Sequence, residues 1–420
     1  MEIKELLAGK IGCECGKDHI CPIESVLIGE NACDSIPALV ERYNSILLVA
    51  DKNTYSVGGK TVSEKLGAKL ADTLVYQTEG VLVPNEIAID ELKAHVTKKT
   101  DLIIGIGSGV INDLCKYVSF VCGLPYYIVA TAPSMDGYAS KGSALILDGM
   151  KVTLNADVPR AIIADVNMLK NAPFDMIQAG YGDIIGKYSC LNDWKLAHLV
   201  NDEYICEFVM NATYEAVEKT VRLAEGLNNR ESDAVYALME ALVAVGILMA
   251  YVGNSRPASG SEHHLSHYFE IVGIVRGEEY FPHGVDVCYS AIETAKIREK
   301  LVALDNIDAF STHHDNAKFE ENVHRIYGSV ADEVIALQKK LGWYDVDRVS
   351  VYKDKWSEIK KVLLDCPTSA EMLALTEKIG LSYDKFVGLY GKEKIADAML
   401  YAKDLKDRYT VLWMYYDLFN

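Results

Sequence analysis

The chain has 420 residues, of which half are apolar and 24% are charged, and its formal net charge at pH 7 is −18. A chain of this length can form two domains, each with its own core. The negative charge argues against a nucleic-acid partner and against binding to an anionic membrane surface. The apolar stretch at 242–252 is shorter than the roughly 20 residues of a membrane span, so we expect a buried helix there and no membrane partner.

The beginning of the chain has no apolar segment behind a basic patch, so we expect no secretory signal and a cytoplasmic protein. Its ten cysteines are then expected to be free thiols. Cys13, Cys15, His19 and Cys21 form a C-x-C-x3-H-x-C cluster. This spacing does not match the usual zinc-ribbon or zinc-finger patterns, so we expect an early turn with buried thiols, and a structural zinc site is the alternative.

Short apolar runs alternate with helical patterns through the first part of the chain. Strands are predicted at residues 25–28, 46–50, 73–76, 102–106, 126–130 and 161–164. Helices are predicted between them at residues 32–43, 55–66, 87–98 and 110–122, and Gly123 is placed to end the last one. Residues 144–147 and 152–154 predict a β-hairpin on an Asp148-Gly149 turn. The strand–helix–strand order predicts an α/β, Rossmann-like domain with an open parallel sheet covered on both faces.

From Pro173 onward the strand-like patterns disappear. Helices are predicted at residues 207–225, 232–252, 285–301, 319–341 and 393–405. We therefore place a domain boundary near Asn171, with an α/β domain over residues 1–171 and an all-helical domain over residues 172–420.

A glycine-rich turn, Gly105-Ile-Gly107-Ser108-Gly109, lies between a predicted strand and a predicted helix. Such a turn lets backbone N–H groups approach a phosphate at a helix N-terminus. The common dinucleotide fingerprint has a third glycine where this chain has Val110. The glycines alone therefore fit a tight structural turn equally well.

Two further polar segments follow predicted strands. Asp51 ends the strand at 46–50, where a carboxylate can bind ribose hydroxyls and repel a 2′-phosphate, which favours NAD over NADP. A helix N-cap is the alternative for Asp51. The loop at 131–137, with Thr131, Ser134 and Asp136, follows another strand. It is expected at the carboxyl edge of the sheet, where open α/β sheets bind ligands.

Histidines gather at residues 254–270 and 281–284, which hold four of the ten. His263 and His267 are four residues apart, so on a helix they share one face. His283 lies between a proline and a glycine, which predicts a loop or the first turn of a helix. Two imidazoles and a carboxylate could form a three-ligand divalent metal site with an open position. Surface histidines that cluster by chance are the alternative.

Five segments of the chain resemble the sn-glycerol-1-phosphate dehydrogenases, particularly their bacterial branch. They are GIGSGVINDLCKY, TAPSMDGYAS, AGYGDIIGKYSCLNDWKLAH, NSRPASGSEHHLSH and FPHG, in the order and spacing of that family. The family is related to the iron-containing alcohol dehydrogenases, the glycerol dehydrogenases and 3-dehydroquinate synthase. The resemblance implies a nucleotide-binding domain followed by a helical metal domain. It also implies an NAD-dependent oxidoreductase that interconverts dihydroxyacetone phosphate and sn-glycerol 1-phosphate, and a homodimer.

The resemblance also implies the roles of individual residues. It implies a divalent metal, zinc or nickel with iron as the alternative, held by Asp183, His263 and His283. Asp136 and His267 are implied as substrate contacts, and His267 is implied as a proton shuttle. Residues implied around the cofactor are Asp51, Gly107, Ser108, Gly109, Asp113, Thr131, Ser134 and Ser140.

Ketone reduction needs a polarised carbonyl, a hydride and a proton for the oxygen. A divalent ion suits the first task, NADH the second, and a histidine titrating near neutrality the third. For the phosphate of the substrate, Lys187 and Arg256 are the nearest candidate donors in the matching segments. A structural ion pair is the alternative for each of them.

Three other functions stay open at this point. A glycerol dehydrogenase would act on the unphosphorylated polyol. A lyase resembling 3-dehydroquinate synthase would be expected to have glutamate in place of Asp183. A catalytically inactive relative could serve as a binding protein, but the complete set of Asp183, His263 and His283 argues against it.

Overall fold

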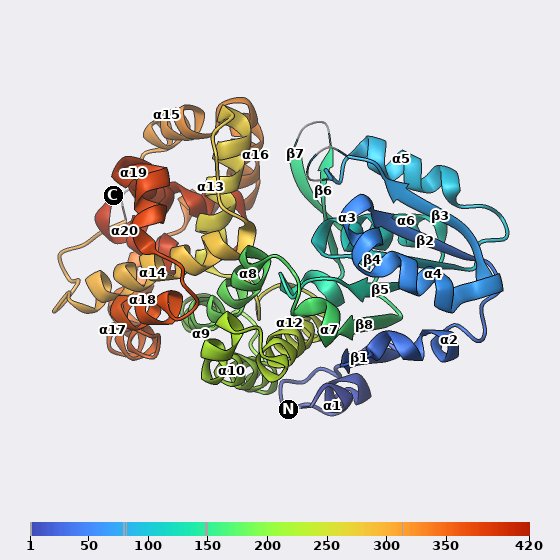
Figure 1. Ribbon diagram of the computed structural model, residues 1–420. Helices are drawn as coiled ribbons and strands as arrows, with labels where there is room; N and C mark the ends of the chain where they lie inside the picture. The colour runs from blue at the N-terminus through green and yellow to red at the C-terminus, as the bar shows by residue number, and fades with distance from the viewer. Residues whose placement is uncertain (1, 79, 81, 148–149, 313) are drawn as a thin grey trace. The chain divides into compact units, whose positions relative to one another are not determined.

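The computed structural model describes residues 2–78, 80, 82–147, 150–312 and 314–420 (Figure 1). The chain forms two compact units, each made of two segments. The first unit comprises Met1–Gly180 and Glu218–Asn254, and the second comprises Tyr181–Val217 and Ser255–Asn420. The first unit thus includes a helical segment from the range expected for the second domain. The boundary near Asn171 stays a prediction.

The first unit is built around a six-stranded sheet in which all neighbouring strands are parallel. In spatial order the strands are β1 (Ser25–Gly29), β8 (Ala161–Asp165), β5 (Tyr126–Ala130), β4 (Leu102–Gly107), β2 (Ile46–Asp51) and β3 (Leu70–Tyr76). The predicted α/β fold with an open parallel sheet is confirmed. Because parallel strands are buried on both faces, they form the continuous apolar runs that the sequence contains.

Successive side chains of a strand point to opposite faces of the sheet, so a continuous apolar strand has two apolar faces to bury. Helices cover both faces of this sheet. On one face Leu48 and Ile104 pack in a buried cluster with α2 (Ile36–Leu39) and α4 (Lys60–Leu66). On the other face α6 (Gly109–Cys122) comes so close that a Cβ at Gly105 would lie 2.9 Å from the Cys115 sulfur. As predicted, α6 ends at Gly123, which adopts a left-handed conformation with φ of 67°.

The other elements of this part of the chain are short. The predicted hairpin is formed by β6 (Gly142–Leu147) and β7 (Met150–Asn155), which pair antiparallel, and its Asp148-Gly149 turn lies outside the described residues. Two predicted helices, at 32–43 and 55–66, are each divided into shorter pieces. The remaining short elements are α1 (Ile3–Ala8), η1 (Ala32–Ser35), α3 (Lys52–Thr54), η2 (Tyr55–Gly59), η3 (Gly67–Lys69), α5 (Glu86–His95), η4 (Asp136–Ala139), α7 (Val166–Leu169) and α11 (Ala224–Asn228).

The long helix α12 (Ser232–Val252) also belongs to the first unit. It has 21 residues and an 18-residue window of mean hydropathy 2.1, so by length and composition it could cross a membrane. The expectation that the apolar stretch is too short was therefore wrong, because the helix begins ten residues before Leu242. The expected burial is confirmed, since 89% of that window is buried inside the protein. Gly246 lets α12 approach η4, where a side chain would meet Ala139 and the Asp136 carbonyl.

Helices α8 (Phe174–Ile185) and α10 (Glu207–Arg222) each begin in one unit and end in the other. The described residues of the second unit contain no strand, which confirms the helical second half. Its helices are α9 (Lys187–Asn201), α13 (Ser261–Arg276), α14 (His283–Val302), α15 (Asn316–Tyr327), η5 (Gly328–Val330), α16 (Ala331–Leu341), η6 (Trp343–Asp345), α17 (Val349–Leu364), α18 (Ser369–Glu377), α19 (Tyr383–Tyr401), η7 (Ala402–Leu405) and α20 (Val411–Phe419).

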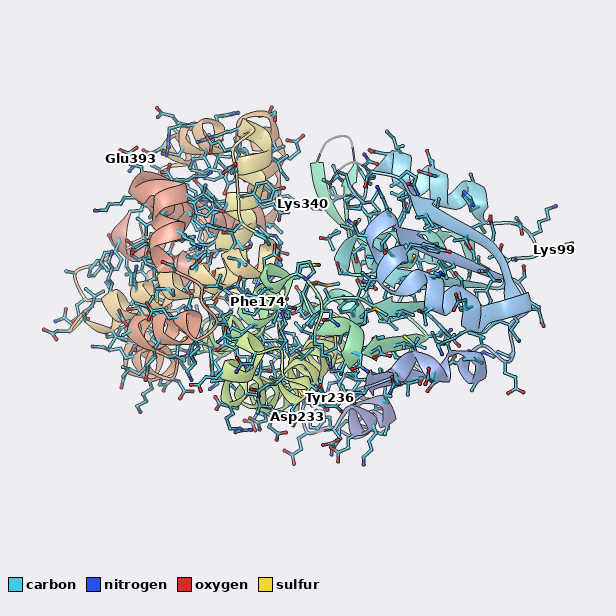
Figure 2. All side chains as sticks on the ribbon, viewed as in Figure 1. Lys99, Phe174, Asp233, Tyr236, Lys340 and Glu393 are labelled. Atoms are coloured by element: carbon cyan, nitrogen blue, oxygen red, sulfur yellow. The ribbon has the colours of Figure 1, made fainter. Side chains whose placement is uncertain are left out.

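One predicted helix of the second unit was wrong. The pattern over 319–341 predicts a single helix, but α15 and α16 are separated at Gly328, whose φ of 51° lies outside the helical region. The side chains of these helices are drawn in Figure 2, where Lys340 on α16 and Glu393 on α19 are labelled.

Candidate metal centre and nucleotide edge

Three side chains of the second unit bring potential metal ligands together. One carboxylate oxygen of Asp183 and one ring nitrogen each of His263 and His283 all lie within 4.8 Å of one another. Asp183 lies in α8, His263 in the first turn of α13, and His283 is the first residue of α14. Of the two possibilities that the sequence left open for His283, a loop or the first turn of a helix, the structure shows the helix. An oxygen and two imidazole nitrogens form a donor set that suits a divalent transition metal.

Glycines allow these helices to come close enough. A Cβ at Gly182 would overlap the carbonyl oxygen of Gly284 and lie 2.8 Å from the Cys288 Cβ, so only glycine fits between α8 and the start of α14. Gly186, one turn later, would place a Cβ 2.5 Å from Val287. Asp183 follows Gly182 directly. These glycines therefore bring Asp183 close to the first turn of α14, where His283 lies.

Asp183 is buried, with only 1% of its surface exposed. Burial alone would raise its pKa, but the Lys187 ammonium and the imidazole of His263 outweigh burial and lower the pKa well below its usual range. Lys187 Nζ donates to Asp183 Oδ1 at 2.7 Å and to the Ala258 carbonyl at 3.0 Å. A buried carboxylate that stays charged is a strong ligand for a cation.

Glu262 fixes the orientation of the His263 ring. His263 Nδ1 donates to Glu262 Oε1 at 2.6 Å, and the same oxygen accepts the Gly260 N–H at 2.8 Å. The other nitrogen of the ring, Nε2, faces Asp183 Oδ1 at 3.4 Å. Burial lowers the pKa of His263, but the hydrogen bonds to Asp183 and Glu262 outweigh burial and raise it. Metal-binding histidines usually donate their other ring N–H to a carboxylate or a carbonyl, and His263 has that arrangement with Glu262.

His283 and His267 complete a group of three imidazoles. His283 Nδ1 lies 3.3 Å from the Ser266 hydroxyl. The ring of His267 lies 5.4 Å from that of His283 and 6.3 Å from that of His263, between ring centres. His267 is therefore a neighbour of the Asp183, His263 and His283 group, as expected from its place one turn after His263. It does not belong to the set whose ligand atoms lie within 4.8 Å among the described residues.

Replacing Gly182 with alanine is expected to push α8 away from α14. We expect the free energy of unfolding to fall by about 1–3 kcal/mol, because the added methyl group meets backbone that cannot move aside easily. Metal retention is expected to fall as well. Thermal unfolding and metal analysis of the purified protein measure both effects.

Gly388→Ala is the matched control for this substitution, because nothing lies within 4 Å of a Cβ placed there in α19. It is expected to leave both quantities unchanged or to raise stability slightly. A Gly182→Ala protein that unfolds at the wild-type temperature and keeps its metal would contradict this account of the packing.

The glycine-rich turn of the first unit follows β4 and leads into α6. A Cβ at Gly107 would lie 2.6 Å from the Ile111 Cβ, so this glycine is required by the packing of α6 on its own strand. Gly109 is different, since a Cβ there would meet only Met135 at 3.7 Å. Ser108 is the N-cap residue of α6 and makes no side-chain cap hydrogen bond. The backbone N–H groups at the start of this 14-residue helix could hold a phosphate.

The other predicted cofactor residues lie along the same edge of the sheet. Strands β5, β4 and β2 are neighbours, so Thr131, the glycine turn and Asp51 follow their carboxyl ends in that order. Thr131 donates its N–H to the Gly107 carbonyl at 3.1 Å. Asp51 caps α3, with Oδ1 accepting the N–H groups of Asn53 at 2.8 Å and Thr54 at 2.9 Å. The N-cap alternative for Asp51 is thus present, and a ribose contact stays a prediction.

Asp113 and Ser140 are joined through the buried Lys116. Lys116 Nζ lies 3.4 Å from Asp113 Oδ1 and from the Ser140 hydroxyl, and donates to the carbonyls of Gly137 and Gly142 at 2.9 Å. Asp113 Oδ2 also accepts the Ala144 N–H at 3.2 Å. This network fastens the loop that contains Ser134 and Asp136, together with β6, to α6. Asp113 and Ser140 thus lie close to each other through Lys116, which the sequence did not indicate, and their place around the cofactor stays a prediction.

The two candidate phosphate donors are both held in ion pairs. Lys187 is fully buried against Asp183. Arg256 is 2% exposed and makes two hydrogen bonds to the Glu203 carboxylate, of which the one from Nε is 2.6 Å long. Arg256 also donates a third hydrogen bond, of 2.8 Å, to the Tyr409 carbonyl. For both residues the structure shows the structural ion pair that the sequence left as the alternative.

Sequence reasoning missed Glu262, Ser266 and the role of Lys187 at the metal centre. Glu262 precedes a ligand directly, and Lys187 lies one helical turn after Asp183, so both spacings could have indicated support for the ligands. Ser266 had no such signal, because its partner His283 lies in another helix.

Comparisons with known proteins show the family to which this chain belongs. A family model described as iron-containing alcohol dehydrogenase matches residues 27–173. The chain is 34% identical over 287 residues to a glycerol-1-phosphate dehydrogenase [NAD(P)+] of Halalkalibacterium halodurans, covering 67% of this chain and 72% of that protein. It is 30% identical over 364 residues to the protein of the same name from Bacillus licheniformis, covering 83% of this chain and 91% of that protein.

Among solved structures, sulfoacetaldehyde reductase from Bifidobacterium kashiwanohense in complex with NAD+ matches 96% of this chain and 98% of its own, with a TM-score of 0.61 and 15% identity. At that identity the match shows a common fold only. The two sequence relatives show more, since each is at least 30% identical and is covered over more than two thirds of its length. This chain therefore belongs to the glycerol-1-phosphate dehydrogenase family.

Proposed function

We propose that this protein is a metal-dependent oxidoreductase that interconverts dihydroxyacetone phosphate and sn-glycerol 1-phosphate with NAD(H). The observation that carries the proposal is the family membership, which extends over 91% of the Bacillus licheniformis relative. The site agrees with it, because the chain has a carboxylate and two imidazoles with ligand atoms within 4.8 Å of one another.

Asp183, His263 and His283 would hold the metal. Their chemistry fits a divalent cation, because Asp183 is kept ionised and Glu262 holds the His263 ring by Nδ1. Zinc or nickel suits this oxygen and nitrogen set, and iron is the alternative. When bound, the ion would supply a positive charge that polarises the carbonyl of the substrate.

NAD(H) would bind at the carboxyl edge of the sheet in the first unit and supply or accept the hydride. The N–H groups at the start of α6 are suited to its pyrophosphate. Asp51 at the end of β2 is suited to ribose hydroxyls through Oδ2, since Oδ1 is taken by the N–H groups of Asn53 and Thr54. Gly107, Thr131, Ser134 and the Asp113–Ser140 network shape the same edge.

Proton transfer, substrate contact and orientation of the histidines are assigned to individual side chains of the protein. His267 is suited to exchange a proton with the substrate oxygen, because it is a partly exposed imidazole beside His283 and His263. Asp136 is proposed to contact the substrate. Glu262 and Ser266 act through the histidines they touch, and they keep each ring in one orientation.

We also propose that the enzyme works as a cytoplasmic homodimer without a nucleic-acid or membrane partner. The net charge of −18 supports the absence of binding to polyanions. Light scattering on the purified protein tests the dimer, and a mass equal to one chain would contradict it.

The substrate is tested by comparing phosphorylated and unphosphorylated triose. We expect kcat/KM for NADH-dependent reduction to be at least about 100-fold higher with dihydroxyacetone phosphate than with dihydroxyacetone, because one charged hydrogen-bonded contact can contribute a few kcal/mol. A preference for dihydroxyacetone would move the protein to the glycerol dehydrogenases. Failure to turn over either ketone would favour the lyase or the inactive binding protein.

Replacing Asp51 with asparagine is expected to reduce the preference for NAD over NADP. The amide removes the charge that would repel a 2′-phosphate, but asparagine is as good an N-cap as aspartate. We expect the ratio of kcat/KM values for NADH and NADPH to fall by about tenfold, equivalent to 1.4 kcal/mol, with little change in thermal stability.

Asp51→Ala separates the two roles of this side chain. It loses the cap as well as the charge, so stability should fall by about 1 kcal/mol and the cofactor ratio should shift as in Asp51→Asn. An unchanged ratio in both variants would mean that this carboxylate does not meet the ribose.

A further inference from the structure

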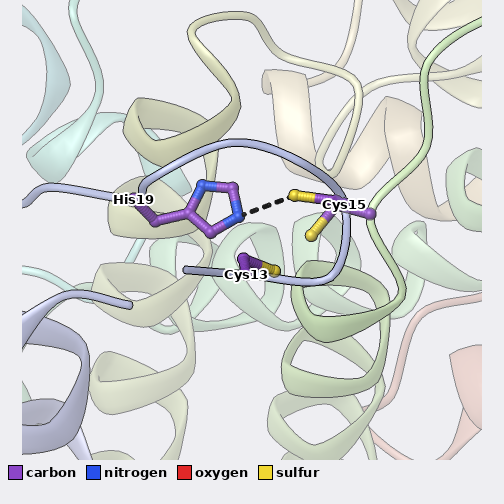
Figure 3. Close-up of side chains that lie close together, drawn as sticks. Cys13, Cys15 and His19 are labelled. Atoms are coloured by element: carbon purple, nitrogen blue, oxygen red, sulfur yellow. Dashed lines mark hydrogen bonds between the residues drawn. The ribbon is translucent and has the colours of Figure 1, made fainter. Parts of the chain in front are cut away.

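We propose that the first unit contains a second metal site, a structural zinc site formed by Cys13, Cys15 and His19. The two thiol sulfurs and a ring nitrogen of His19 all lie within 4.8 Å of one another. Figure 3 shows the three side chains on one loop, with the sulfur of Cys15 3.4 Å from His19 Nε2. This group shares no residue with the Asp183, His263 and His283 group.

The spacing of the donor atoms fits zinc. Zinc–sulfur bonds of about 2.3 Å and zinc–nitrogen bonds of about 2.0 Å in a tetrahedron place neighbouring donors roughly 3.5–3.8 Å apart. The distance between Cys15 and His19 is close to that value without any rearrangement of the loop. Two soft thiolates and an imidazole favour zinc over calcium or magnesium, which take oxygen ligands.

A second observation concerns the other nitrogen of His19. Its Nδ1 lies 3.3 Å from the carbonyl oxygen of Tyr251, and the ring stacks on the Tyr251 ring with 5.1 Å between centres. A carbonyl oxygen only accepts hydrogen bonds, so Nδ1 carries the hydrogen and Nε2 carries the lone pair. Nε2 is the atom that faces Cys15. Metal-binding histidines are oriented in this way, with one nitrogen on a carbonyl and the other on the ion.

Backbone hydrogen bonds fix the conformation of the loop that contains Cys13, Cys15 and His19. Lys10 and His19 exchange both backbone hydrogen bonds, at 2.8 and 2.9 Å, which closes the loop at its base. Gly16 donates its N–H to the Cys13 carbonyl at 2.9 Å in a turn where its φ is 82°. His19 is fully buried and Cys13 is 8% exposed. A zinc ion here would fasten the loop to the last turn of α12, to which Tyr251 belongs.

Cys21 is outside this group. Its thiol is not among the ligand atoms that gather within 4.8 Å in the described part of the chain, although the sequence cluster includes it. Three donors from this loop leave one position of a tetrahedral zinc site for a further ligand. Cys21→Ser is therefore the matched control for Cys15→Ser.

The test uses the full chain with His283→Ala, so that the other metal group is impaired. Zinc is measured after purification and dialysis, and cobalt(II) is then exchanged for it. We expect about one metal ion per chain and an intense thiolate-to-cobalt charge-transfer absorption. Both are expected to disappear in the Cys15→Ser variant and to persist in Cys21→Ser. Because Asp183, His263 and His283 offer no sulfur, this absorption reports the cysteine site whether or not the proposed function is correct.

A measurement on the unmutated protein covers the case in which Cys15→Ser does not fold. A mercurial reagent that modifies thiols is added in steps, and released zinc is followed with a chromogenic chelator. Zinc release that follows thiol modification supports the proposal. It is overturned if no zinc is released, or if the cobalt protein lacks the thiolate absorption. In that case the contact between Cys15 and His19 is only a hydrogen bond from a thiol.

Discussion

A His283→Ala protein is expected to retain no metal in the Asp183 group and to lose at least about a thousandfold in kcat/KM for reduction of dihydroxyacetone phosphate. The size of the loss follows from the several kcal/mol by which a metal ion stabilises charge that develops on a carbonyl oxygen. Removing one of three protein ligands leaves Asp183 and His263, which are held together by their own charge interaction at 3.4 Å. A divalent cation would then have to compete with that pair.

Binding of NADH is expected to stay within a few-fold of wild type in this variant, because the nucleotide edge is built from β2, β4, β5 and α6. Fluorescence titration with NADH measures cofactor binding, and NADH oxidation in the presence of dihydroxyacetone phosphate measures turnover. His324→Ala is the control, since His324 is an exposed histidine of α15 whose partner is Asp332 at 3.7 Å. Full activity in His283→Ala would remove the metal assignment.

A His267→Ala protein is expected to keep its metal and to lose about 10²–10⁴-fold in kcat, the usual contribution of a positioned acid or base. His267 lies beside His283 and His263 but outside the set of converging ligand atoms among the described residues. The pH profile provides a second measurement, because the limb that reports ionisation of this imidazole should disappear from the variant. Loss of metal instead of turnover would mean that the roles of His263 and His267 are wrongly divided.

The sequence predicted the first unit well because its strands are buried on both faces. Runs such as Ile46–Asp51 and Leu102–Gly107 have no polar alternation, which is typical of strands in a parallel sheet that helices cover on both faces. The end of α6 at Gly123 depends on local conformation, so it could be predicted as well, whereas for His283 the sequence left a loop and a first helical turn open. The division of 319–341 could not, because a glycine within a helical pattern does not show whether it will adopt a positive φ.

The predicted site residues were less certain where their partners are distant in the sequence. Arg256 pairs with Glu203 and with the carbonyl of Tyr409, and neither partner is indicated by the sequence around it. Lys187 and Asp183 lie one helical turn apart, so their ion pair could have been predicted from the spacing. The three proposed metal ligands come from three helices, and the resemblance to a family supplied what periodicity could not.

The central claim is that Asp183, His263 and His283 hold the ion on which catalysis depends. The most direct measurement is NADH oxidation with dihydroxyacetone phosphate by metal-stripped protein, with zinc or nickel then added back. The account predicts negligible turnover without metal and restored turnover when it is returned, in wild type but not in His283→Ala. Turnover by the stripped wild-type protein, or equal restoration in His283→Ala, would contradict it.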